Sequence, residues 1–182
     1  LKLVMMLAAP YIAGRNAQDA LARAKRLYSE GGYCSTIDIL GEDAKSDEDC
    51  DRSVDNYKKL IDMVFAAGNP ALAIEKNSTV SFKPSMFSIV SPASDAASRG
   101  KHLMRAAERI EDIVSHAKEK KVRVTLEAED YRWTDFHLDT YFQLVNAGYH
   151  NLGTVLQARL LHTEKDIKST DKRTRIRQVK ET

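Results

Sequence analysis

Apolar positions along the chain follow two different periods, one typical of helices and one typical of strands. Apolar residues at every third or fourth position predict amphipathic helices over 16–32, 46–68, 95–120 and 134–148. Runs rich in β-branched residues predict strands over 33–40, 78–83, 122–130, 151–160 and 175–180. The short polar segment 163–171 predicts a further helix or a turn. Strands and helices therefore alternate along the chain.

The ends of several predicted elements carry recognisable signals. Asn16 and Ser46 can accept hydrogen bonds from the first free N–H groups of a helix, and Asp49 follows Ser46 by three positions. The glycine pair 31–32 is typical of the end of a helix. Pro84 ends the second strand, because proline has no N–H group to donate to a sheet.

Alternation of strands with helices predicts a parallel sheet with right-handed crossovers. Its two usual forms are a doubly wound sheet and a TIM-type (β/α)8 barrel. In the barrel, functional side chains lie at the carboxyl ends of the strands. The residues that follow each predicted strand therefore test the barrel interpretation.

Polar residues occur at or just past the end of every predicted strand. They are Glu42 and Asp43, then Lys83, then Glu127, Glu129 and Asp130, then Gln157 and Arg159, and finally Arg177 and Lys180. Any one of them alone would suit a solvated loop, but on a barrel all of them point to one mouth. A mouth that mixes cations, anions and an amide suits a zwitterionic or anionic ligand.

Composition and charge argue against several other functions. A net charge of +2 over 182 residues is too small to imply a nucleic acid partner or an anionic membrane. Cys34 and Cys50 form no C-x-x-C motif, so we expect no metal site and a reducing, cytoplasmic compartment. The longest apolar run, 3–14, is too short to span a bilayer.

Histidine and tryptophan residues have simple structural explanations. His102, His116 and His137 lie on predicted helices, where we expect them to pack at the surface or in grooves and to bind no metal. Trp133 follows the third strand beside the proposed mouth. We expect it to anchor the loop, and a lid over a bound ligand is the alternative.

Five short motifs occur in a fixed order: TIDILGED, VSFKPS, VTLEAEDYRWTDFHLDTYFQL, NLGTVLQARLLHTEKDI and RIRQVK. In this order they resemble the proline dehydrogenase family, which includes the proline dehydrogenase domain of the bifunctional proline-utilisation proteins. The resemblance extends from about Tyr11 to Lys180, and it rests on the ordered set, since no single motif identifies the family.

The resemblance implies a (β/α)8 barrel, to which this chain would contribute about the first five β/α units. Five units cannot close such a barrel, so we expect residues 1–182 to form a partial barrel domain. The remaining strands and the last helix would come from the rest of a longer parent chain. That expectation also fits a chain that begins with Leu1.

The activity that the resemblance implies is the FAD-dependent oxidation of L-proline to Δ1-pyrroline-5-carboxylate, the first step of proline catabolism. Electrons would pass from the flavin to a membrane quinone, and no nucleic acid would be involved. The implied location is the cytoplasm of a bacterium, with peripheral association with the membrane, or the mitochondrion in a eukaryote.

Three motif residues match positions that act on the substrate in the family. Glu42 matches the acidic residue after the first strand, which pairs with an arginine of the last helix and gates the site. Lys83 matches the lysine that helps to hold the proline carboxylate. Glu127 falls where the family usually has aspartate beside the flavin and the substrate. The resemblance therefore assigns these residues, with Arg177, to catalysis.

The cofactor-binding positions of the family match residues of the last two strands. Gln157 matches the glutamine that hydrogen-bonds the isoalloxazine ring. Arg177 matches the arginine near flavin N5, and Lys180 matches a cofactor-binding lysine. A fixed cation near N5 would stabilise the reduced, anionic flavin. Glu127 would lie beside the same cofactor.

Some residues depart from the family pattern. Glu127 is one methylene longer than aspartate, and Arg159 stands where an aromatic residue is usual. These departures leave open a catalytically inactive barrel relative that serves as a binding or scaffold module. A third possibility is another (β/α)8 enzyme, such as a Schiff-base aldolase that uses the amine of Lys83.

Overall fold

The computed structural model describes residues 13–41, 44–72, 74–129, 131–158, 160, 163–169 and 175–179. The strands of this part are β1 (Thr36–Asp38), β2 (Thr79–Phe82), β3 (Val124–Leu126), β4 (Leu152–Gln157) and β5 (Arg175–Val179). The α-helices are α2 (Ala17–Gly31), α3 (Asp47–Ala67), α4 (Arg99–Glu119), α5 (Thr134–Asn146) and α6 (Thr163–Ser169). Short 3-10 helices are η1 (Ile74–Lys76), η2 (Pro84–Phe87) and η3 (Tyr131–Trp133).

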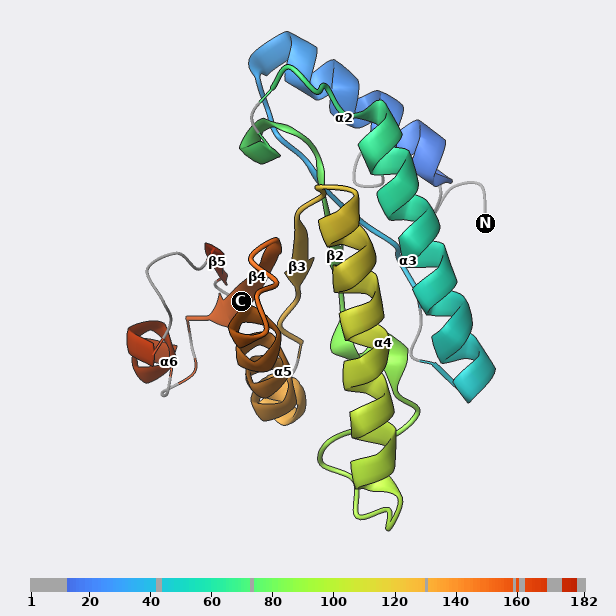
Figure 1. Ribbon diagram of the computed structural model, residues 1–182, viewed down its shortest axis with the longest axis vertical. Coiled ribbons are helices and arrows are strands. Elements are labelled where there is room, and N and C mark those ends of the chain that lie inside the picture. The colour runs from blue at the N-terminus through green and yellow to red at the C-terminus, as the bar shows by residue number, and fades with distance from the viewer. Residues whose placement is uncertain are drawn as a thin grey trace, which may run out of the picture.

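Each described strand pairs in parallel with the next strand along the chain, which gives the order β1-β2-β3-β4-β5. A doubly wound sheet reverses the direction of its strand order, whereas a barrel adds each strand beside the previous one. The predicted parallel sheet is therefore confirmed, and its order is that of a barrel. Helices α3, α4 and α5 lie in a row over one face of this sheet (Figure 1).

The predicted helix signals act as expected. The side chain of Asn16 accepts a hydrogen bond from the Asp19 N–H at 2.8 Å, at the start of α2. Ser46 accepts one from the Asp49 N–H at 3.1 Å, at the start of α3. At the other end of α2, Gly32 adopts the left-handed conformation, with φ 69°, and glycine does so without steric cost.

The strands are shorter than their hydrophobic patterns predict. β1 and β3 each have only three residues. Pro84 ends β2 as predicted and opens η2. β4 ends at Gln157, whose carbonyl accepts hydrogen bonds from the turn that follows. The helix predicted from residue 95 begins at Arg99.

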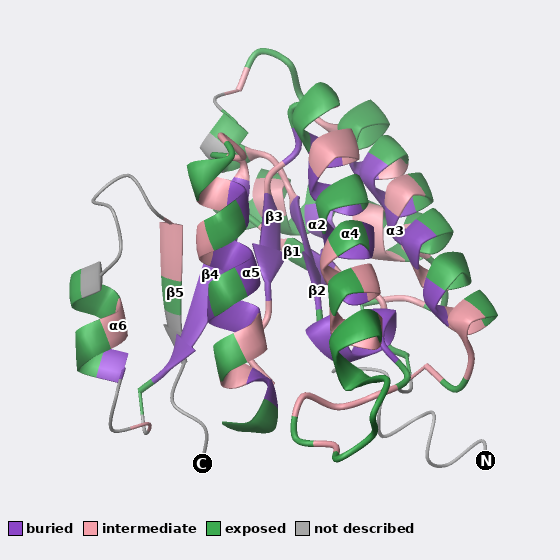
Figure 2. Ribbon diagram, turned by 60° about the horizontal axis from the view of Figure 1, so that its bottom comes forward, coloured by how far each residue is buried: buried purple, intermediate pink, exposed green. Residues whose placement is uncertain are grey.

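The face of the sheet toward the helices is apolar and tightly packed. Val80, Val124 and Leu152 share one register position, and each is at most 3 % exposed. The buried strands lie behind helices whose outer turns are exposed (Figure 2). Phe82, on this face, meets Tyr57 of α3 with ring centroids 5.6 Å apart, which adds edge-to-face contact to the burial of both rings.

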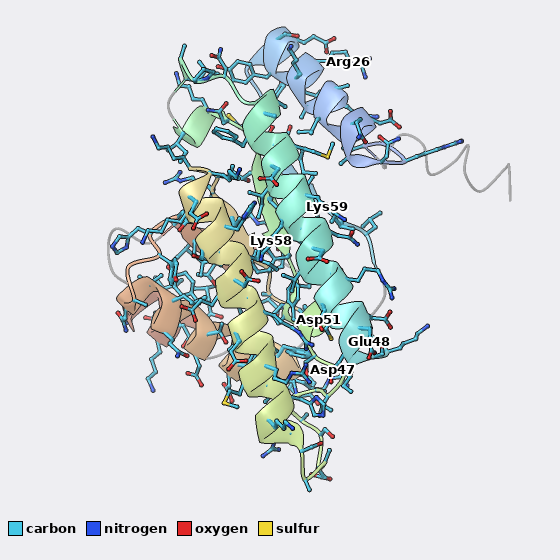
Figure 3. The ribbon with its side chains drawn as sticks, turned by 45° about the vertical axis from the view of Figure 1, so that its right-hand side comes forward. Arg26, Asp47, Glu48, Asp51, Lys58 and Lys59 are labelled. Carbon is cyan, nitrogen blue, oxygen red and sulfur yellow. The ribbon has the colours of Figure 1, made fainter. Side chains whose placement is uncertain are left out.

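Helices α3 and α4 are joined by ion pairs along their shared length (Figure 3). Arg109 of α4 is buried and donates to Asp47 at 3.0 Å and to Asp51 at 2.8 Å. Farther along α3, Lys58 pairs with Asp112 of α4 at 2.6 Å. These contacts join the two helices side by side. Removal of a partner of the buried Arg109 guanidinium should cost more stability than removal of the exposed pair.

The prediction for His137 is wrong, because this side chain is a core residue. It is 2 % exposed, and its Nε2 lies 2.8 Å from the Thr154 hydroxyl of β4. Burial lowers the pKa of His137 to about 4. Trp133 is buried against Phe136, with ring centroids 5.8 Å apart, as expected of a loop anchor.

Candidate functional site

The face of the sheet away from the helices carries mostly polar side chains, because alternate residues of a strand point to opposite faces. The polar residues of this inner face are Thr36, Asp38, Thr79, Ser81, Lys83, Thr125, Glu127, Gln157, Arg175 and Arg177. Those at the carboxyl ends of the strands form the mouth that the sequence predicts.

Glu127 and Arg177 form an ion pair at this mouth. Both carboxylate oxygens of Glu127, just past β3, accept hydrogen bonds from Nη2 of Arg177 in β5. The Glu127 side chain is 15 % exposed and that of Arg177 is 45 % exposed. The guanidinium is thus anchored on one side while much of its surface stays available to a ligand.

Lys83 directly follows β2 and is exposed, and its charge acts on the carboxyl of Asp38 in β1. Burial raises the pKa of the Asp38 carboxyl, and the Glu127 charge adds to this rise. A hydrogen bond from Tyr57 and the Lys83 charge act in the opposite direction. Residues from β1, β2 and β3 therefore share one electrostatic environment.

Asp38 is a candidate site residue that the strand-end analysis missed. The predicted strand, 33–40, runs past it, whereas β1 ends at Asp38. The Tyr57 hydroxyl lies 3.1 Å from Asp38 Oδ1 and 3.2 Å from Met86 Sδ. An ionisable residue inside an apolar strand was the available signal, since carboxylates are seldom buried without a partner.

Gln157 is fixed at the end of β4. It is 2 % exposed, and its Nε2 donates to the backbone carbonyl of Glu129. The backbone carbonyl of Gln157 accepts hydrogen bonds from the Thr163 hydroxyl at 2.6 Å and from the Leu160 N–H at 3.2 Å. The amide is therefore preorganised at the mouth beside the third and fifth strands.

A second arginine on the inner face, Arg175, was not singled out in the sequence. Its Nη2 crosses β4 at Gly153 and donates to the Thr125 hydroxyl at 2.6 Å and to the Val124 carbonyl at 3.2 Å. Burial lowers the pKa of Arg175, and the charges of Arg123 and Arg177 lower it further. Below the mouth the barrel face thus carries additional positive charge.

Five of the predicted strand-end residues lie on the inner face or in the loops at the mouth, and they are Lys83, Glu127, Glu129, Gln157 and Arg177. The remaining strand-end residues lie outside the described part of the chain, and they are Glu42, Asp43, Asp130, Arg159 and Lys180. Within the described part, no helix is both long enough and apolar enough to cross a bilayer.

The family model described as proline dehydrogenase matches residues 20–180. Proline dehydrogenase 1 of Bacillus subtilis strain 168 is 32% identical over 171 residues, which cover 93% of this chain and 50% of that protein. Proline dehydrogenase of Deinococcus radiodurans is 30% identical over 177 residues, covering 96% of this chain and 52% of that protein. The chain spans about half the length of the curated relatives it matches.

Solved structures share the fold. Proline utilization A from Bdellovibrio bacteriovorus, inactivated by N-propargylglycine, superposes with a TM-score of 0.84 at 23% identity, over 99% of this chain and 21% of that chain. A variant of the same protein from Bradyrhizobium japonicum gives a TM-score of 0.76 at 21% identity, over 99% of this chain and 19% of that one. The predicted barrel-type fold is thereby confirmed over a partial length.

Proposed function

The chain belongs to the proline dehydrogenase family, and from that premise we propose that it forms part of an enzyme that oxidises L-proline to Δ1-pyrroline-5-carboxylate. The observation that carries the proposal is the Glu127–Arg177 ion pair beside Lys83 and Gln157. These residues come from or directly follow four different strands, β2 to β5, and enzymes of this barrel type carry their active sites at the carboxyl ends of the strands.

The charges at the mouth suit a small zwitterion. The ammonium of Lys83 would attract the carboxylate of proline, and the carboxylates of Asp38 and Glu127 belong to the same inner face of the sheet. A lysine is a point charge without the fork of an arginine, so Lys83 alone would hold a carboxylate with little control of direction. Further cations from the rest of the parent chain would complete the clamp.

FAD is the cofactor we propose, since the residues present fit it. Arg177 offers a partly exposed guanidinium and Gln157 a buried amide, which suit the carbonyl and ring-nitrogen acceptors of an isoalloxazine. When bound, FAD supplies the acceptor for the hydride that leaves proline. Glu127 would orient Arg177, whose charge favours the anionic form that such an acceptor takes.

The test is a flavin assay on the parent protein that contains this chain. We expect a flavin absorption band at about 450 nm that bleaches when L-proline is added in the absence of oxygen. A Lys83→Met variant should raise the KM for proline at least about tenfold, the value of one lost charged contact of 1.4 kcal/mol. A Lys76→Met variant, exposed in η1 at the opposite end of β2, should not.

A colourless preparation, or a flavin band that proline leaves unchanged, would contradict the proposal and favour the inactive scaffold. Trapping of Lys83 by borohydride in the presence of a carbonyl substrate would instead favour the Schiff-base enzyme.

We further propose a quinone as the electron acceptor, which the enzyme would reach by peripheral association with a membrane. A water-soluble quinone analogue should then reoxidise the bleached protein faster than dissolved oxygen does.

A further inference from the structure

Glu129 alone joins three strand ends at the mouth. Its Oε2 accepts a hydrogen bond from the Ser85 N–H at 3.0 Å, and its Oε1 accepts one from the Ser85 hydroxyl at 2.6 Å. Its backbone carbonyl accepts from Nε2 of Gln157. The loop after β3 is therefore bonded to the segment after β2 and to the end of β4.

The bond to Ser85 satisfies a buried donor that local residues leave open. η2 begins with Pro84, which has no N–H group, and its N-cap residue Lys83 makes no side-chain capping bond. The next N–H group belongs to Ser85, which is 6 % exposed. A buried N–H without a partner is destabilising, so the carboxylate of Glu129 acts as a cap supplied from the loop after β3.

The bonds between Glu129 and Ser85 also help to hold Lys83, the residue that precedes η2. Lys83 is the N-cap of η2, and its carbonyl accepts from the Met86 N–H at 3.3 Å. The far end of η2 is held separately, because Arg109 donates to the Phe87 carbonyl at 3.1 Å. Phe87 of η2 also packs against Tyr57 and Phe82, so the two bonds between Ser85 and Glu129 add a polar tie between the start of η2 and the loop after β3.

We propose that Glu129 is a positioning residue that sets the separation between Lys83 and Gln157. The inference rests on the proposed function, in which Lys83 holds the substrate carboxylate and Gln157 holds the flavin. One residue would then couple the substrate side of the mouth to its cofactor side. Glu129 itself touches neither ligand in this proposal, and it acts through Ser85 and through the Gln157 amide.

The kinetic test compares Glu129→Gln, Ser85→Ala and the double variant in the parent protein. Glu129→Gln replaces one acceptor by an NH2 group and removes the charge, so we expect about a tenfold higher KM for proline with a smaller fall in kcat. Ser85→Ala removes one of the two bonds and should raise KM about threefold. Exposed Glu119→Gln, at the end of α4, is the matched control.

The double variant decides whether the two residues act through one bond. Its KM should equal that of Glu129→Gln alone, because residues that share an interaction are not additive. If the rise in KM of the double variant equals the product of the two single rises, the inference is overturned. An unchanged KM in both folded single variants would also overturn it. A fall in kcat as large as the rise in KM, with both in proportion to a lower thermal midpoint, would also overturn it, since it would indicate a purely structural role.

Amide hydrogen exchange tests the same tie without any activity. In Glu129→Gln, residues 83–88 should exchange about tenfold faster, while α4 keeps its protection. If the unaltered protein fails to oxidise proline, the proposed function fails, and exchange still decides whether Glu129 fixes η2. Unchanged exchange in 83–88 overturns the positioning role whether or not the protein is active.

Discussion

The two faces of the sheet differ in packing and in chemistry although they are built from the same strands. On the outer face, which is the face toward the helices, the side chains of Val80, Phe82, Val124 and Leu126 are 0 % exposed. On the inner face the mouth carries charged groups, and Arg177 is 45 % exposed. Alternation along each strand lets one segment serve both purposes. Stability and ligand binding should therefore respond to different substitutions, and the expected losses of stability can be ranked.

The largest loss is expected for Phe82→Ala on the outer face. The Phe82 ring packs edge-on against Tyr57 and against Phe87, with centroids 5.6 and 5.7 Å away. Its removal should lower the free energy of unfolding by about 3–5 kcal/mol. Phe65→Ala, at a side chain that is 54% exposed, should change it by less than about 0.5 kcal/mol. Denaturant titration measures both, and equal losses would abolish the distinction between the faces.

The next effect concerns His137 of α5, a buried polar side chain that packs against the outer face of the sheet at Thr154. The unfolded chain binds a proton below pH 6.5, but the buried imidazole does so only near pH 4, so acid favours unfolding between these values. At about 1.4 kcal/mol per pH unit, roughly 3 kcal/mol is lost as the pH falls through this window. Unfolding titrations at several pH values measure this slope.

A His137→Asn variant provides the control for that slope. It should be less stable at neutral pH, because the bond to Thr154 changes, but its loss of stability between pH 6.5 and pH 4 should be smaller. The same slope in the variant and in the unaltered protein would assign the pH dependence to other groups.

Gly153→Ala tests the inner face below the mouth and should have an intermediate effect. A Cβ atom there would lie 2.9 Å from Arg175 Nε and 3.0 Å from the Arg175 carbonyl oxygen. We expect a loss of about 1–3 kcal/mol in the free energy of unfolding, as for other overpacked positions. Gly100→Ala, where nothing lies within 4 Å, should be neutral or slightly stabilising. Thermal melts of the two variants should differ in sign or clearly in size.

The smallest loss of stability is expected for Arg177→Met at the mouth. Its partner Glu127 is near the surface, and such pairs contribute about 0–1 kcal/mol. Flavin retention and bleaching by proline should nevertheless fall sharply, and Arg177→Lys should restore part of the flavin affinity by restoring the charge. If Arg177→Met instead lowers the free energy of unfolding by several kcal/mol while the folded variant keeps its flavin, the roles of the two faces are reversed.

Local signals in the sequence predict the sheet, its alternation and the helix caps at Asn16 and Ser46, because each depends on residues within a few positions. The buried state of His137 depends on Thr154, which only the folded chain brings close. Asp38 and Arg175 were missed for the same reason, since their partners lie on other elements. Strand-end position alone identified Lys83 and Gln157.

The sequential order of the strands also has a consequence for how the chain folds. Every described strand adds beside the one made just before it, so its backbone partners are already present when it emerges from the ribosome. Sheet growth then needs only one βα-sized loop to close at each step, which keeps the entropic cost of each step low. A chain built in this way can gain structure progressively, from its first strand toward its last.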